Sequence, residues 1–94
     1  MSLRYTLTAR APFSADWHKS THDTLAAALS VAWRRYKRGW SVDNISHGPS
    51  IVIDNDGLMR TFARMDDLKR ETPKRPLGEV SDQIVRGIEK DVSE

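Results

Sequence analysis

The clearest hydrophobic pattern in the chain lies between residues 24 and 38. Apolar side chains recur there at intervals of three and four residues: Leu25, Ala28, Leu29, Ala32, Trp33 and Tyr36. This spacing places them on one stripe of an amphipathic α-helix, because an α-helix turns once about every 3.6 residues. Asp23 or Thr24 can cap the N-terminus, and Gly39 suits the left-handed position that ends a helix. The sequence therefore predicts a main helix over residues 24–38.

Segments on either side of this helix have the composition of strands. Residues 5–9 alternate large and small side chains, and residues 17–20 are expected to return beside them as a hairpin. Residues 40–45 and 50–54 contain the β-branched side chains that strands favour. The sequence thus predicts two strands before the helix and two after it.

A turn-like segment, Asp54-Asn55-Asp56-Gly57, follows the last of these strands. An Asp-Gly pair between two apolar runs is a strong signal for a β-hairpin, so residues 58–62 are expected to form a further strand. The loop can have two or three residues, and this choice decides which face each side chain takes. A short helix is expected next, near residues 64–71.

The C-terminal part of the chain has a weaker pattern. Two prolines and a glycine interrupt residues 73–78, which predicts a linker. Beyond it, four apolar residues follow one another at intervals of four: Val80, Ile84, Ile88 and Val92. This stripe is thin, so residues 79–94 are expected to be an acidic segment that is weakly helical or disordered. We therefore divide the chain into a compact domain (1–72), the linker and this segment.

These elements predict an α+β fold, in which a small antiparallel sheet of three to five strands packs on the main helix. The expected core comprises Leu7, Val42, Ile51, Ile53, Leu58, Phe62, Leu25, Leu29 and Trp33. One helix covers only one sheet face, so the second face is expected to need residues 79–92 or another copy of the chain. An exposed apolar face of that size marks an interface. The candidate interface residues are Val80, Ile84, Ile88 and Val92.

Composition narrows the class of protein. The chain has 94 residues, 30% of them charged, and no cysteine, which excludes a disulfide scaffold and a thiolate zinc site. No apolar run is long enough to span a membrane, and the N-terminus lacks the apolar core of a secretory signal. We expect a small soluble cytoplasmic domain. The net charge of +2 conceals a basic body, +5 over residues 1–38, and an acidic end, −3 over the last eighteen residues.

The sequence contains no motif for catalysis, a cofactor or a metal. It has no GxSxG elbow, Gly-rich phosphate loop or HExxH. His18 and His22 are four residues apart but precede the main helix, so they are not expected to converge on a metal. Asp66 and Asp67 are adjacent, and neighbours on a helix point about 100° apart. We expect no catalytic, cofactor-binding or metal-binding residue.

The basic side chains are the remaining candidates for contacts with phosphates or an acidic partner: Arg34, Arg35, Lys37, Arg38, Lys74 and Arg75. Trp40 or Tyr36 could supply a stacking face, although these cations equally suit a solvated helix end. The leading hypothesis is a non-enzymatic protein-interaction or homo-oligomerising accessory module. The alternative is a nucleic-acid-binding accessory domain that uses the basic helix end. A second alternative, a small-ligand binder or enzyme, predicts a pocket near Trp17, Trp40 or the histidines.

Overall fold

The computed structural model describes residues 4–92, and the side chains of residues 4–88. It contains one four-stranded antiparallel sheet with the spatial order β2-β1-β3-β4, made of β1 (Tyr5–Arg10), β2 (His18–His22), β3 (Ser41–His47) and β4 (Ser50–Ile53). Three helices complete it: α1 (Leu25–Lys37), α2 (Asn55–Glu71) and α3 (Leu77–Val92). The predicted α+β class, the antiparallel sheet and the main helix are confirmed.

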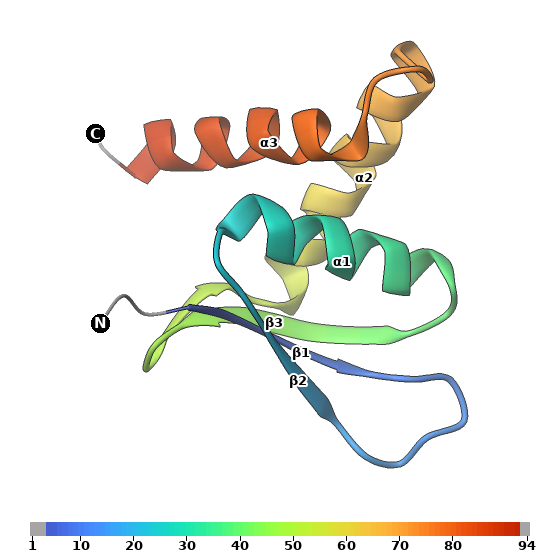
Figure 1. The fold of residues 1–94 in the computed structure, drawn as a ribbon, viewed down its shortest axis with the longest axis vertical. Helices are drawn as coiled ribbons and strands as arrows, with labels where there is room; N and C mark the ends of the chain where they lie inside the picture. Colours follow the sequence, from blue (N-terminus) through green and yellow to red (C-terminus); the bar gives the residue numbers. More distant parts are fainter. Residues whose placement is uncertain (1–3, 93–94) are drawn as a thin grey trace.

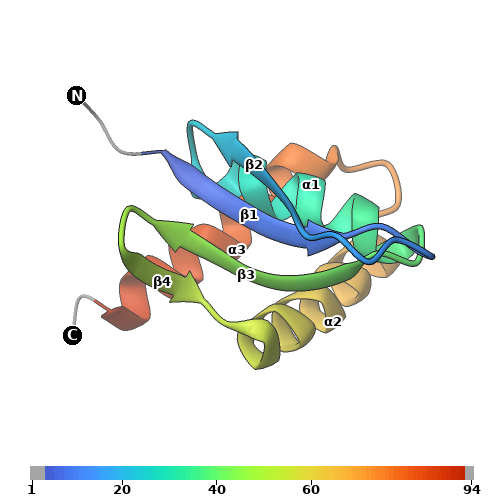
Figure 2. The same cartoon turned by 90° about the horizontal axis from the view of Figure 1, so that it is seen from below.

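All three helices lie on the same side of the sheet (Figure 1). Helix α1 packs against β1 and β3, and α2 packs against β3 and β4. Helix α3 lies over α1 and α2 on the side away from the sheet, where it forms a third layer. Figure 2, in which the molecule is seen from below, shows that no helix covers the other sheet face, which we call the open face.

The open face is polar, because side chains alternate between the two faces along each strand. Leu7 pairs with Ser20 and Ile45 on the face that the helices cover. The neighbouring cross-strand pairs point the other way and consist of Thr6, Thr21, Ser46, Thr8, Lys19 and Asn44. The prediction that residues 79–92 cover this face is wrong. Hydroxyl and amide side chains can face water, so the fold itself does not require a cover there.

Helix α2 replaces the hairpin predicted around Asp54–Gly57. The Asp54 carboxylate accepts a hydrogen bond from the Gly57 backbone N–H at 2.8 Å, which makes Asp54 the N-cap of a 17-residue helix. Leu58, Phe62 and Met65 then form one buried stripe at helical spacing. The predicted strand over 58–62 is therefore wrong. Aspartate favours turns and helix N-caps for the same reason, since its side chain accepts hydrogen bonds from nearby backbone N–H groups.

Helix α3 begins at Leu77, inside the segment predicted as a linker, and runs to Val92. Val80 is completely buried and Ile84 is 5% exposed, and both belong to the main hydrophobic core. Ser81 is also buried, and its hydroxyl lies 2.7 Å from the hydroxyl of Ser30 on α1. Burial of one side of α3 supplies the stabilisation that its thin apolar stripe lacks in isolation.

Seven of the nine residues predicted for the core are buried: Leu7, Leu25, Leu29, Val42, Ile53, Leu58 and Phe62. Ile51 is 62% exposed, so its assignment to the core is wrong. It pairs with Ser46 on the open face, whereas Ile53 pairs with Ile45 on the covered face after an irregularity in the register. Trp33 is half-buried, and its indole N–H donates to Asp66 at 2.9 Å.

The contrast between Ile84 and Ile51 gives a direct test of this packing. We expect Ile84→Ala to lower the free energy of unfolding by about 2–4 kcal/mol, because it leaves a cavity between α3 and the other helices. The matched variant Ile51→Ala removes the same atoms from an exposed site and should cost less than about 1 kcal/mol. Urea denaturation measures both values. Equal losses would mean that α3 does not contribute to the core.

Candidate functional site

The basic residues expected to contact a polyanion differ in how the fold uses them. The Lys37 ammonium lies 2.8 and 2.9 Å from the two carboxylate oxygens of Asp66. Arg75 pairs with Glu79 at 3.5 Å and donates to the Gln83 side chain. These two cations already have partners within the fold.

The Arg35 guanidinium lies over the Trp40 ring at 4.7 Å. One of its nitrogens is buried and has no hydrogen-bond acceptor among the described residues, and the π-face of the indole provides its favourable contact. Arg34, Arg38 and Lys74 are exposed. Arg34 and Arg38 lie at the end of α1, whereas Lys74 lies in the loop between α2 and α3 (Figure 1). The six residues therefore come from two parts of the chain, the end of α1 and the loop between α2 and α3.

The two aromatic rings proposed for stacking have intramolecular neighbours. Tyr36 stacks on Phe62 with 4.9 Å between the ring centroids. Trp40 is half-buried and lies between Arg35 and His18, whose ring centroid is 6.1 Å away. Tyr36 keeps 39% of its surface exposed, and the more accessible aromatic side chains lie around the β1–β2 loop, where Phe13 is fully exposed and Trp17 is 48% exposed. No hydrophobic periodicity in the sequence marks Phe13, which directly follows Pro12.

The residues of the candidate interface stripe on α3 differ in how far the fold buries them. Val80 and Ile84 are buried within the chain. Ile88 is half-buried at the edge of the core, and the side chain of Val92 lies outside the described residues. Of the described stripe residues, Ile88 is thus the one with surface left for a partner.

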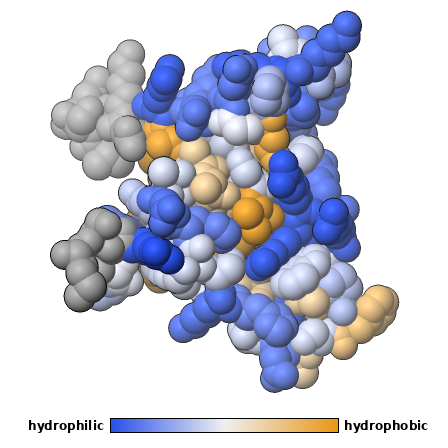
Figure 3. Space-filling model, viewed as in Figure 1, coloured by the Kyte–Doolittle hydropathy of each residue, from blue (hydrophilic) through white to orange (hydrophobic). Residues whose placement is uncertain are grey.

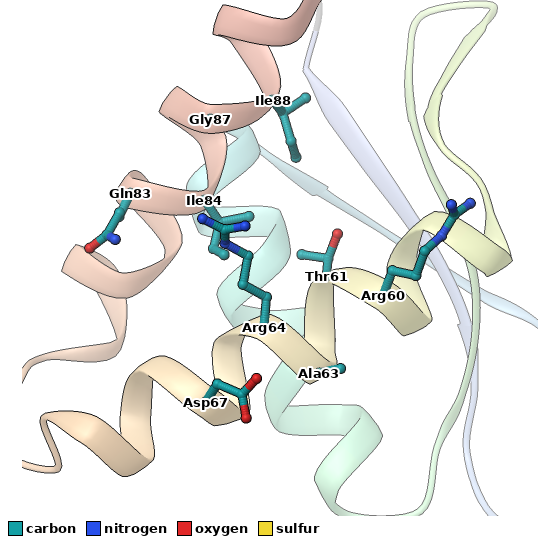
Figure 4. Close-up of a pocket in the computed structure, with 9 residues that line it drawn as sticks. All are labelled: Arg60, Thr61, Ala63, Arg64, Asp67, Gln83, Ile84, Gly87 and Ile88. Carbon is teal, nitrogen blue, oxygen red and sulfur yellow. The ribbon is translucent and has the colours of Figure 1, made fainter.

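Two connected hollows lie on the side of the molecule formed by α2, α3 and β4. The larger one, about 670 Å³, runs between α2 and α3 and is lined by the nine residues drawn in Figure 4. Arg64 extends from α2 toward Ile84 on α3, while Arg60 points away from α3 (Figure 4). The smaller hollow, about 300 Å³, lies beside β4 and shares Thr61 and Ile88 with the first. Neither hollow includes Trp17, Trp40 or a histidine.

Asp66 joins α1 to α2 through two hydrogen bonds. Partial burial acts to raise the pKa of Asp66, but hydrogen bonds from Lys37 and Trp33 outweigh it and hold the pKa below its ordinary value. The charges of Lys37 and Arg70 act in the same direction. Asp66 is therefore a structural carboxylate that stays ionised, which does not suit it to exchange protons near neutral pH.

The ionisation of His22 is also perturbed. Burial lowers the pKa of His22 and the charge of Arg35 lowers it further, while Asp23 acts in the opposite direction. The Ser20 hydroxyl lies 2.9 Å from the Nε2 atom of His22. Among the described side chains, those of residues 4–88, no three His, Asp or Glu groups gather where they could hold a metal ion.

Comparisons with known proteins leave the chain without relatives to draw on: no protein-family model, curated protein or solved structure matches it. Within the described part of the chain, no helix combines the length and apolar character needed to cross a membrane. Functional proposals therefore rest on the surfaces described above.

The Asp66 contacts predict an acid-dependent stability. Because the folded pKa is below the unfolded value of about 3.9, the stabilisation is present above pH 4 and is lost as the pH falls through the folded pKa. Asp66→Asn should lower the free energy of unfolding at pH 7 by on the order of 1 kcal/mol and flatten this acid dependence. The control, Asp67→Asn, removes a carboxylate that pairs only with exposed Arg70 and should change little. Denaturation at pH 7 and pH 3 distinguishes the two.

Proposed function

We propose that this protein is a non-enzymatic interaction module that self-associates through the outer side of β4 and the neighbouring parts of α2 and α3. The observation that carries the proposal is the exposure of two adjacent apolar residues on an edge strand, Ile51 at 62% and Val52 at 39%. Ile88 of α3 lines the same small hollow as both. We call these three residues the β4 patch.

Edge strands are usually protected by charged side chains or proline, because their free backbone groups otherwise recruit other strands. Strand β4 reads Ser-Ile-Val-Ile and carries no charge, whereas the opposite edge strand, β2, carries Lys19 and two histidines. The two edges of the sheet thus differ, and β4 has the composition of a surface that another protein covers.

The irregularity in β4 determines how a partner would pack. Ile51 and Ile53 have partners on β3, but Val52 between them has none. A bulge of this kind bends the strand and interrupts its hydrogen-bonding edge. We therefore expect the second molecule to contact the β4 patch through side chains rather than to extend the sheet.

The charges beside the β4 patch favour a second copy of this chain as the partner. Helix α2 starts next to the patch with exposed Asp56, and it carries exposed Arg60 and Arg64 one and two turns later. Among the described residues, none of these three side chains forms an ion pair. A two-fold axis through the patch would bring the acidic end of one α2 toward the basic part of the other, which makes the surface self-complementary.

The other hypotheses have less support. A nucleic-acid-binding role for the basic end of α1 would have to break the contacts of Lys37 and Arg35. An enzyme or small-ligand binder would need polar groups that converge in a pocket. In the larger hollow Arg60 points away from α3 and Asp67 pairs with Arg70, so its polar side chains do not converge on one point. The cytoplasmic location remains part of this proposal and rests on the sequence alone.

Sedimentation velocity from low to high micromolar concentration tests self-association. We expect a monomer–dimer equilibrium for the natural sequence and a shift to monomer for Ile51→Lys, with little change in thermal stability because residue 51 is exposed. The matched control, Thr21→Lys, adds the same charge to the other edge strand and should leave the equilibrium unchanged.

Charge reversal tests the two-fold arrangement separately. Arg64→Glu and Asp56→Lys should each weaken self-association, and an equimolar mixture of the two variants should recover part of it as a heterodimer. A natural sequence that stays monomeric at every concentration would contradict the proposal. So would an Ile51→Lys variant that associates as well as Thr21→Lys.

A further inference from the structure

The β1–β2 loop, residues 11–17, presents aromatic side chains to solvent. It projects beyond the sheet at the lower right of Figure 1, where Figure 3 shows apolar surface at the margin of the molecule. Phe13 is fully exposed, and Trp17 keeps about half of its surface free. Large exposed aromatic rings are costly to keep in water, so two of them on one loop indicate a binding surface.

This loop is held in a defined conformation. The Ser14 backbone N–H donates to the Ala11 carbonyl at 3.2 Å, and the Asp16 N–H donates to the Ser14 hydroxyl at 3.2 Å. Pro12 lies against Gly39 at the end of α1, where an added Cβ would be 3.5 Å from the proline ring. Phe13 has a φ of +65°, a left-handed conformation that is uncommon and unfavourable for a bulky residue. The fold therefore bears a conformational cost that places the Phe13 ring outward.

Cations accompany these rings on the open face. The Arg10 guanidinium lies 5.0 Å from the centre of the Trp17 ring. Arg10 pairs with Ser41 and points to the same face as Thr8, and Lys19 pairs with Thr8 from the adjacent strand. Among the side chains of residues 4–88, no ion pair joins Arg10 or Lys19 to an acidic group. Positive charge that the fold does not neutralise is thus available beside the aromatic loop.

The rest of the open face supplies small hydrogen-bonding groups. Over β1, β2 and β3, beyond Arg10 and Lys19, it presents the hydroxyls and the amide of Thr6, Thr8, Thr21, Ser46 and Asn44. Figure 2 shows that no helix or loop crosses this face. Such side chains can bond to sugars and base edges, but they offer little apolar area to a folded protein or a lipid surface.

Together these groups match the chemistry of an unpaired nucleic acid strand. Aromatic rings stack on exposed bases, and Arg and Lys neutralise phosphates along the backbone. A duplex hides its base faces, so stacking on Phe13 and Trp17 requires a single strand. We propose that the open face binds single-stranded RNA or DNA, with bases on Trp17 and Phe13 and phosphates at Arg10 and Lys19. The rings and cations belong to β1, β2 and the loop between them, whereas the β4 patch lies at the opposite edge of the sheet, so strand binding adds a ligand to the proposed self-association.

Fluorescence anisotropy of labelled oligouridylate and oligothymidylate at low ionic strength tests the proposal. Trp17→Ala should weaken binding roughly 5- to 100-fold, the loss expected for one base-stacking contact, whereas Trp17→Phe should keep most of the affinity. Lys19→Gln should weaken binding and reduce its salt dependence, because it removes one phosphate contact. The matched control is Arg64→Gln, which removes an exposed cation from the α2–α3 side and should leave affinity unchanged.

Competitors identify the ligand class. A matched duplex and heparin should bind more weakly than the single strands, and Trp17→Ala should not alter their binding. Absence of oligonucleotide binding at low salt would overturn the proposal, as would equal losses for Lys19→Gln and Arg64→Gln. Binding to anionic phospholipid vesicles through Trp17, without oligonucleotide binding, would also overturn it. The Arg64→Glu variant, which should weaken self-association from the α2–α3 side, should bind the strands as well as the natural sequence. Loss of self-association and loss of strand binding are therefore measured separately.

Discussion

Burial of helix α1 on two sides is the interaction on which the rest of the structure depends. One side of the helix packs on β1 and β3, and another packs on α3. Ala28 and Ala32 are completely buried, and their small side chains allow close approach of the neighbouring elements. Ser30 meets Ser81 of α3 in the same layer, so both hydroxyls are satisfied where water is excluded. With α1 in this position, the buried apolar side chains of the chain pack on one side of the sheet.

That arrangement determines which surfaces remain for function. Because α1 and α2 cover one sheet face and α3 covers the helices, the chain closes its core without using the second face. The open face is then free to carry Thr, Ser, Lys and Arg side chains. The helices do not cover the edge of the sheet at β4, so Ile51 and Val52 stay exposed to solvent there. The two proposed surfaces are therefore consequences of one packing scheme, and they lie toward opposite edges of the sheet.

Charge placement follows from the same packing. Asp66 accepts hydrogen bonds from Trp33 and Lys37 and thereby joins α2 to α1. Lys37, which the sequence alone leaves as a candidate for contact with a partner, is therefore engaged within the fold. Arg35 is held similarly by Trp40. Which basic side chains lack an acidic partner depends on the positions that the fold gives them, and not on how many basic residues a stretch of sequence contains. Arg10 and Lys19 are far apart from the basic run at residues 34–38 in the sequence, and they became candidates only through the pairing of β1 with β2.

Local sequence patterns determined the α+β class, the span of α1 and the four strands, because each depends on residues close together in the chain. The spacing of Leu25, Leu29 and Trp33 requires a helix whatever the element packs against. Asp54–Gly57 shows the limit of this reasoning. Its signal is the same for a hairpin turn and a helix N-cap, and the choice was made by burial of Leu58, Phe62 and Met65 against the rest of the core. The tertiary structure alone likewise decided that Ile51 and Phe13 are exposed and that residues 77–92 form a helix. The exposure of a side chain depends on what surrounds it, and the thin apolar stripe of α3 is stabilised by the core against which it packs.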